Sequence, residues 1–338
     1  MQTGNRDGEG VLAIVCPGQG SQTPGFLAPW LELPGLRARA EALGKAADLD
    51  LVAHGTTSDG DTIRDTAVAQ PLIVGAGLLA LDALYADLPR TLADTAGVVA
   101  GHSVGEITGA ASTGVLSHED AMGLVSVRGR AMAQASAVTP TGMSAVLGGD
   151  PQEVLDALGR HGLTAANQNG AGQVVAAGTL EQLAALAADP PARARVVPLQ
   201  VAGAFHTAHM GPAVDAMRAQ AQGLAVHDPR AALLSNADGA LLESGRAVIE
   251  RLVSQVSSPV RWDLCMDTMT HLGVTALVEV APAGTLVGLA KRGMKGVELV
   301  ALKTPDDLDR ARDLVMRHAA VSAASVTSAP PSQSQERP

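Results

Sequence analysis

The chain has 338 residues, of which 46% are hydrophobic, so it is long enough to form a sizeable core in one large domain with an insertion or in two domains. Aromatic residues make up only 1%, and the core must therefore be built from alanine, valine and leucine. The formal net charge of −10, without any block of lysine and arginine interleaved with aromatics, argues against a nucleic-acid-binding surface.

We expect neither a membrane span nor a secretory signal. No run reaches the roughly 18 uncharged apolar residues that a span needs, and residues 1–10 lack a charged segment followed by an apolar one. Cys16 and Cys265 form neither a CxxC pair nor a zinc-ligand spacing, and we expect both to be small buried hydrophobes. The expectation is a cytoplasmic protein without a metal site.

Buried strands alternate with helices in the first part of the chain. Residues 10–16 and 97–100 are short apolar runs and predict strands, whereas the longer apolar run 67–88 predicts a buried helix. A helix is expected over 104–114, and Ser117 is placed to cap the helix after it. This alternation predicts an α/β domain with a largely parallel sheet.

The pattern changes between residues 139 and 202, where a strand–helix–strand–strand–helix–strand order predicts a ferredoxin-like small domain inserted into the large one. The six expected elements are 144–147, 151–160, 163–167, 173–177, 180–188 and 195–199, with a turn at 169–172.

The strand and helix alternation then resumes, with strands near Leu233 and Leu277 and a helix after Gly284. The large domain would comprise residues 11–138 and 203–318. We expect the remaining residues, 1–10 and 319–338, to be flexible termini, because the second of these segments is rich in alanine, serine, proline and glutamine.

Residues 101–105, Gly-His-Ser-Val-Gly, stand between a predicted strand and a predicted helix, which is the pattern of a nucleophile elbow. The turn would lift the Ser103 hydroxyl to a helix N-terminus, where the Val104 amide can stabilise an oxyanion. The alternative is an ordinary glycine-rich turn. His102 adjoins Ser103, and its side chain leaves the turn in another direction, so it is not expected to be the base.

His206 stands out among the nine histidines because it lies in a loop-like segment, 201–207, at a domain boundary. His209 follows at i+3, but no carboxylate accompanies the pair, and a metal site is not expected there.

Gly18-Gln19-Gly20 follows the first strand but is not a dinucleotide fingerprint, because the next glycine, Gly25, comes two places too late. The segment is either a plain turn or a close approach of backbone to ligand, with the Gln19 amide as a second oxyanion donor.

Arg128 and Arg130 lie two residues apart on one expected helix, so they face different ways. Arg128 is on the more apolar side, and a covered arginine needs an anionic partner. That partner is either an internal carboxylate or the carboxylate of a substrate, held by the two prongs of the guanidinium.

Taken together, these segments resemble the malonyl-CoA:acyl-carrier-protein transacylase family. The likeness runs from about residue 11 to 316 and is greatest to the stand-alone enzymes of high-GC bacteria. The motifs that carry it, in the family's order, are 17–22 (PGQGSQ), 101–106 (GHSVGE), 127–129 (VRG), 205–206 (FH) and 279–282 (EVAP).

The resemblance implies an α/β-hydrolase-like domain with a ferredoxin-like insertion, and it implies roles for matching residues. Ser103 is the acylated nucleophile and His206 its general base, oriented by the backbone carbonyl of Gln255 in place of a carboxylate.

The resemblance also assigns the groups that bind the substrate. The amides of Gln19 and Val104 form the oxyanion hole. Arg128 binds the malonyl carboxylate, and Gln19 and His102 are further substrate-binding residues. Phe205 replaces the serine of many stand-alone members and supports malonyl over methylmalonyl. Ala281-Pro282-Ala283-Gly284 departs from the commoner Gly-Pro-Gly, with no effect expected.

The implied activity is transfer of a malonyl group from malonyl-CoA to the phosphopantetheine thiol of acyl carrier protein by ping-pong kinetics, for fatty-acid or polyketide synthesis. A monomer without a cofactor is expected. Because the chain and acyl carrier proteins are both acidic, attraction must be local, and Lys291, Arg292 and Lys295 form the densest basic group. They either border the thiol entrance or are a solvated helix end.

Two rival functions share the elbow. A serine esterase or thioesterase forms the same acyl-serine but releases free acid. A non-enzymatic scaffold that binds carrier protein would have lost Ser103 or His206, and both are present.

Overall fold

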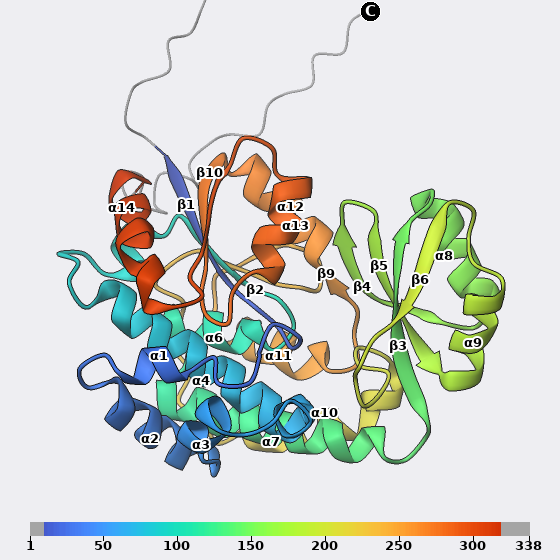
Figure 1. Ribbon diagram of the computed structural model, residues 1–338, viewed down its shortest axis with the longest axis horizontal. Helices are drawn as coiled ribbons and strands as arrows, with labels where there is room; N and C mark the ends of the chain where they lie inside the picture. Colours follow the sequence, from blue (N-terminus) through green and yellow to red (C-terminus); the bar gives the residue numbers. More distant parts are fainter. Residues whose placement is uncertain (1–9, 319–338) are drawn as a thin grey trace, which may run out of the picture.

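The computed structural model describes residues 10–318 (Figure 1). Apart from Gly10, the termini predicted to be flexible lie outside the described residues. A larger α/β part holds both ends of the described chain, and a small sheet with two helices lies beside it.

Strands and helices alternate through most of the described chain. The strands are β1 (Val11–Cys16), β2 (Val98–Gly101), β3 (Thr141–Gly148), β4 (Thr164–Gly170), β5 (Gln173–Thr179), β6 (Ala194–Pro198), β7 (Leu233–Leu234), β8 (Leu241–Leu242), β9 (Val260–Arg261), β10 (Val274–Glu279) and β11 (Glu298–Ala301). The α-helices are α1 (Ala28–Leu31), α2 (Leu36–Ala47), α3 (Leu51–Thr56), α4 (Thr66–Tyr85), α5 (Leu92–Thr95), α6 (Gly105–Ser112), α7 (His118–Ser136), α8 (Pro151–Arg160), α9 (Leu180–Ala188), α10 (Gly211–Ala221), α11 (Gly245–Gln255), α12 (Trp262–His271), α13 (Thr285–Gly293) and α14 (Leu308–His318).

The large sheet has the order β11-β10-β1-β2-β7-β8, and all of its neighbouring strands are parallel except β7 and β8. The largely parallel sheet predicted from the sequence is thus confirmed. Its central strand β1 is buried along its whole length. Leu12, Ile14 and Cys16 belong to one hydrophobic core and Val11, Ala13 and Val15 to another, because successive side chains point to opposite faces.

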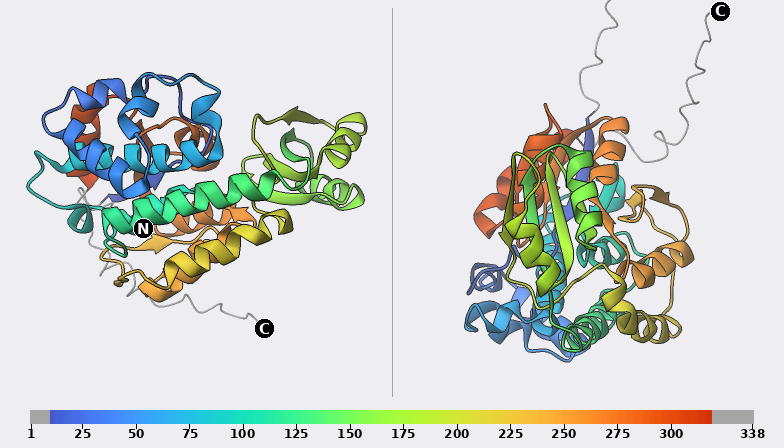
Figure 2. Two further views of the ribbon diagram at one scale, coloured as in Figure 1. Left: turned by 90° about the horizontal axis from the view of Figure 1, so that it is seen from below. Right: turned by 90° about the vertical axis from the view of Figure 1, so that its right-hand side faces the viewer.

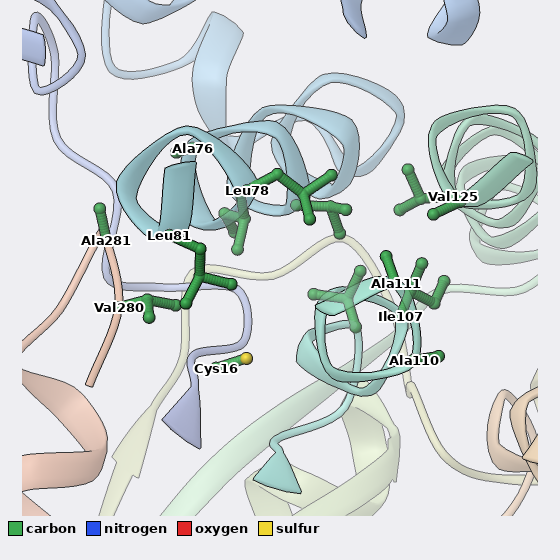
Figure 3. Close-up of a cluster of buried hydrophobic side chains, with 14 of the residues drawn as sticks. Cys16, Ala76, Leu78, Leu81, Ile107, Ala110, Ala111, Val125, Val280 and Ala281 are labelled. Atoms are coloured by element: carbon green, nitrogen blue, oxygen red, sulfur yellow. The ribbon is translucent and has the colours of Figure 1, made fainter. Parts of the chain in front are cut away.

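Helices cover both faces of this sheet, which is why its strands are apolar throughout. One core is shared with α2, α4, α6, α7 and α14, and the other with α12 and α13. Figure 3 shows Leu78 and Leu81 of α4 near Ile107 of α6 and the end of β1 at Cys16.

Helix α4 is the one helix within residues 10–318 that is long and apolar enough to cross a membrane by length and composition. It contains the charged Asp82, and 83% of its apolar window is buried inside the protein, so it is the core helix expected from residues 67–88.

The small sheet has the order β6-β3-β5-β4-β9 and is antiparallel except for the β4–β9 pair. Helices α8 and α9 pack on it around a separate core that includes Val146, Leu158 and Leu186. The predicted order of elements is confirmed, with both helices at the predicted residues. The added strand β9 comes from a later part of the chain. Figure 2 shows α7 running from the larger part toward this sheet, and the chain enters the sheet with the next element, β3.

The predicted turn at 169–172 is wrong in its first half. Asn169 and Gly170 belong to β4, and only Ala171 and Gly172, both with positive φ, connect it to β5. Strand pairing across this hairpin continues to Gly170 and Gln173, and a local cluster of turn-forming residues cannot reveal how far pairing extends.

Candidate active site

Ser103 lies in a sharp turn between β2 and α6, with φ at +53°, a left-handed value that L-residues adopt at a cost. Its flanking glycines leave the room that the turn needs. A Cβ on Gly101 would stand 2.0 Å from the Gly105 carbonyl carbon, and one on Gly105 would stand 2.1 Å from the Cys16 oxygen. A larger residue at Gly101 would push α6 away from β2, and one at Gly105 would push it away from the end of β1.

The side-chain amides of Asn236 and Gln255 form hydrogen bonds with the backbone of the strained turn. The Ser103 backbone N–H donates to Asn236 Oδ1 at 2.7 Å, and Asn236 Nδ2 donates to the Gly101 oxygen at 2.6 Å. On the other side, Gln255 Nε2 donates to the Ser103 oxygen at 2.9 Å. The backbone of the elbow is thus bonded on both sides of Ser103 by residues from distant parts of the chain.

His206 is brought to Ser103 from the loop before α10. Its Nε2 lies 2.7 Å from Ser103 Oγ, and its Nδ1 lies 2.9 Å from the Gln255 backbone oxygen. A carbonyl oxygen only accepts, so Nδ1 carries the proton and Nε2 is left to accept from the serine hydroxyl. Burial, together with the positive charge of Arg128, lowers the pKa of His206 to about 3, so the imidazole is neutral at pH 7.

Arg128 on α7 is 1% exposed, whereas Arg130 is exposed, as the helix spacing predicts. Arg128 Nη2 donates to Ser103 Oγ at 3.3 Å and to Gln255 Oε1 at 2.7 Å, and Nη1 donates to Gln70 Oε1 at 2.8 Å. Within residues 10–318 it forms no salt bridge, so the alternative of an internal carboxylate partner is not what the structure contains. Burial lowers its pKa to about 10, and the guanidinium stays charged at neutral pH.

The amides of Val104 and Gln19 are the predicted oxyanion donors, and neither has a hydrogen-bond partner among the described residues. Val104 immediately precedes α6, and the N-terminal end of a helix carries partial positive charge that attracts anions. Gln19 belongs to the loop after β1. A Cβ on the adjacent Gly18 would stand 2.8 Å from the His102 oxygen, so this loop lies against the elbow.

His102 contacts the small sheet through its imidazole ring. Its Nε2 lies 2.9 Å from Asn169 Oδ1 of β4, and its ring meets that of Trp262 edge to face at 5.6 Å. Burial lowers its pKa. The structure thus brings His102 into contact with the small sheet rather than into the hydrogen-bonded group around Ser103.

The other predicted residues divide between the interior and the surface. Phe205 is buried directly before His206. Lys291, Arg292 and Lys295 are exposed at the end of α13, a helix that contacts β4 of the small sheet. No hydrogen bond or ion pair of the described chain joins these three cations to the group around Ser103.

Asn236 and Gln70 were not predicted from the sequence as residues of the site. The structural role of Glu106 was not predicted either. Glu106 was visible only as part of the family motif. Asn236 and Gln70 stand in no recognisable pattern, and only the fold brings them to the elbow and to Arg128.

Comparisons with known proteins show the family of the chain. Residues 13–325 match the family model of the acyl transferase domain. A Mycobacterium tuberculosis protein named malonyl CoA-acyl carrier protein transacylase is 54% identical over 306 residues, which span 90% of this chain and 100% of that relative. An Escherichia coli protein of the same name is 30% identical over 310 residues, 90% of this chain and 99% of the relative.

Solved structures give the same result. The crystal structure of MCAT from Mycobacterium tuberculosis has a TM-score of 0.85 at 53% identity and covers 89% of this chain and 99% of its own. A type II PKS acyl-carrier protein in complex with its malonyl-transacylase gives a TM-score of 0.83 at 28% identity, with 90% and 99% covered. The chain belongs to the acyl transferase family and, within it, to the malonyl CoA-acyl carrier protein transacylases.

Proposed function

We propose that this protein transfers a malonyl group from malonyl-CoA to the phosphopantetheine thiol of an acyl carrier protein, through a malonyl ester of Ser103. One observation carries the proposal. The Ser103 hydroxyl contacts a neutral imidazole at 2.7 Å and, at 3.3 Å, a buried guanidinium that has no ion-pair partner among the described residues. A nucleophile, its base and a cation for an acyl carboxylate therefore meet at one atom.

In the first half-reaction, His206 Nε2 takes the proton of the Ser103 hydroxyl as Oγ attacks the thioester carbonyl. The free amides of Val104 and Gln19 stabilise the oxyanion of the tetrahedral intermediate. The loss of one such donor in other enzymes costs about 10²–10³ in rate. When the carbon–sulfur bond breaks, His206 returns the proton to the sulfur, CoA leaves as its thiol, and malonyl-Ser103 remains.

In the second half-reaction, the phosphopantetheine thiol gives its proton to His206 and attacks the ester carbonyl. The carbon–oxygen bond breaks, Ser103 recovers the proton from His206, and malonyl-carrier protein leaves. Because CoA departs before the carrier protein reacts, the kinetics are ping-pong. All groups used belong to this chain, and we propose no cofactor.

Arg128 binds the free carboxylate of the malonyl group. Gln70 and Gln255 hold its guanidinium through amide oxygens, which orient the charge without neutralising it. An acetyl group would leave this buried cation unpaired, and so the arrangement favours malonyl over acetyl.

Phe205 supports malonyl over methylmalonyl as the preferred acyl group. It is 6% exposed and directly precedes the proposed base, and we propose that its ring takes the space that an α-methyl group would need. Gln19 and His102 complete the proposed substrate-binding set, and both adjoin the elbow.

A serine hydrolase and a non-enzymatic scaffold remain the rivals to be tested. Purified protein is incubated with malonyl-CoA, with and without carrier protein bearing the phosphopantetheine arm, and free malonate and malonyl-carrier protein are quantified. We expect slow malonate release and rapid formation of malonyl-carrier protein. Rapid malonate release in both conditions would identify a hydrolase, and no CoA release in either would identify a scaffold.

For the domain organisation, we propose an α/β-hydrolase-like large domain of residues 11–138 and 203–318 with a ferredoxin-like small domain of residues 139–202. The strand order β6-β3-β5-β4 and the separate core of the small sheet support this division. The site lies where the two meet, since His102 of the elbow contacts Asn169 of the small sheet.

We further propose that the protein works as a cytoplasmic monomer and supplies fatty-acid or polyketide synthesis. The exposed cations Lys291, Arg292 and Lys295 would receive the acidic carrier protein. Their position at and just after the end of α13, a helix that contacts the small sheet, supports a docking surface near the junction of the two domains.

A further inference from the structure

We propose that Glu106 is a positioning residue that fixes the side-chain amide of Gln255 and, through it, the guanidinium of Arg128. The proposal rests on the proposed function, in which Arg128 binds the malonyl carboxylate, and extends it to the residues that hold Arg128 in place.

Glu106 is a buried carboxylate whose hydrogen-bond partners are uncharged. It lies in the first turn of α6, is 6% exposed, and forms no salt bridge within residues 10–318. Burial raises the pKa of its carboxyl group to about 7, so keeping it ionised costs stability. A buried acid kept at such a cost, so close to reacting groups, calls for a functional explanation.

Both carboxylate oxygens of Glu106 accept hydrogen bonds. Oε1 accepts from the Asn236 backbone N–H at 2.6 Å, and Oε2 accepts from Gln255 Nε2. An ionised carboxylate offers an acceptor to each of these N–H groups, whereas an amide in its place would direct its own NH₂ group at one of them.

The contact with Glu106 decides which way the Gln255 amide faces. Gln255 Nε2 stands between Glu106 and the Ser103 oxygen, so Oε1 is turned toward Arg128 Nη2, 2.7 Å away. A flipped amide would place its oxygen against a carboxylate and a carbonyl, and its NH₂ group against the guanidinium. The negative charge of Glu106 thus selects the orientation that gives Arg128 an acceptor.

The base is held differently. His206 Nδ1 bonds to the backbone oxygen of Gln255, which is independent of the side-chain amide. Disturbing Glu106 should therefore affect binding of the malonyl carboxylate more than proton transfer. The Gln255–Ser103 hydrogen bond serves all acyl groups equally, and its loss cancels when two acyl groups are compared.

The test compares loading of malonyl and acetyl from their CoA thioesters, measured as kcat/KM for CoA release, in Glu106→Gln, Gln255→Ala and the double variant. Gln255→Ala keeps the backbone oxygen for His206. We expect each single variant to lower the malonyl-to-acetyl ratio roughly ten- to hundredfold, as for a lost hydrogen bond to a charged group. The double variant should lose no more than either single one, because both act through one contact.

An unchanged ratio in folded Glu106→Gln, or losses that add in the double variant, would overturn the proposal. If Glu106→Gln does not fold, Gln255→Ala decides alone, since the hydrogen bonds that join Glu106 to Arg128 run through that amide, and a wild-type ratio would again overturn it. The wild type and Arg128→Ala are measured first. If the wild type shows no malonyl preference, the proposed function fails and this proposal with it. If that preference disappears in Arg128→Ala but persists in Gln255→Ala, only the role of Glu106 is wrong.

Discussion

The Ser103 hydroxyl lies within reach of a neutral imidazole and a charged guanidinium, and the two groups influence each other. The charge of Arg128 disfavours the imidazolium and contributes to the low pKa of His206. A malonyl carboxylate bound to Arg128 would offset that charge and make His206 a stronger base. An acetyl group would not, so the same contact that binds the correct acyl group also activates the nucleophile.

The first prediction at this scale concerns Arg128. Arg128→Ala should abolish the preference for malonyl over acetyl, because the carboxylate loses charge-assisted bonds of about 1.5–3 kcal/mol each. Competitive loading of Ser103 from an equimolar mixture of the two thioesters measures this. Arg128→Lys is the matched control. It keeps the positive charge but cannot donate two parallel hydrogen bonds to a carboxylate, and it should retain part of the preference. Undiminished malonyl preference in Arg128→Ala would show that another group binds the carboxylate.

The second prediction at this scale concerns His206 and the pH dependence of stability. His206 has a pKa near 3 in the folded protein and near 6.5 when unfolded, so between these values the unfolded chain binds more protons. Its contribution to stability is complete above pH 6.5 and declines below it by about 1.4 kcal/mol per pH unit. The difference in unfolding free energy between wild type and His206→Gln, from denaturant titrations at pH 7.5 and 5, should shrink by about 2 kcal/mol. A difference that stays constant over this range contradicts a buried neutral base.

At the scale of elements, the strand–turn–helix unit around Ser103 was predictable because its sequence is explicit: an apolar run, two glycines and a helix. Helices α8 and α9 were equally explicit, since Asp150 caps one before Pro151 and Thr179 forms a capping box at the other. Strands β8 and β9, of two residues each, have no periodicity to detect and were not predicted. Asn236 was beyond prediction for a different reason, because its partners lie about 130 residues away.

The close packing around Ser103 predicts that substitution of Gly105 has a very different effect from substitution of Gly288 on α13, which serves as the control. Gly105→Ala places a methyl group 2.1 Å from the Cys16 oxygen, so α6 must move, at a cost of about 1–3 kcal/mol. Malonyl loading of Ser103 should fall with it. Gly288→Ala on α13 has only Arg292 Nη1 at 4.0 Å and should stabilise the helix by up to about 1 kcal/mol. Thermal melting and loading assays compare the two, and a fully active Gly105→Ala protein would contradict the close packing of β1 and α6.

At the scale of the whole molecule, a chain of net charge −10 must receive an acidic partner at a local patch. The exposed group Lys291, Arg292 and Lys295 is our proposed patch. The fold accounts for its place: α13 follows β10 of the large sheet and also contacts β4 of the small one.

Reversing these three charges to glutamate should lower kcat/KM for carrier protein by at least about tenfold at low salt, chiefly through slower association, and leave malonyl-CoA loading unchanged. The matched control reverses three exposed cations elsewhere, Arg37, Lys45 and Arg160, and so makes the same change in net charge. Equal losses in both triple variants would mean that overall charge, not this patch, governs the encounter.

The malonyl ester of Ser103 is the central claim, and mass spectrometry tests it most directly. The protein is treated with malonyl-CoA, and in parallel with methylmalonyl-CoA and acetyl-CoA, and the intact mass and the modified peptide are measured before and after addition of carrier protein bearing its thiol. We predict one malonyl group on Ser103, less methylmalonyl and acetyl, complete discharge by the thiol, and no adduct in Ser103→Ala. An unmodified wild-type Ser103, or an adduct that persists in Ser103→Ala, would contradict the account.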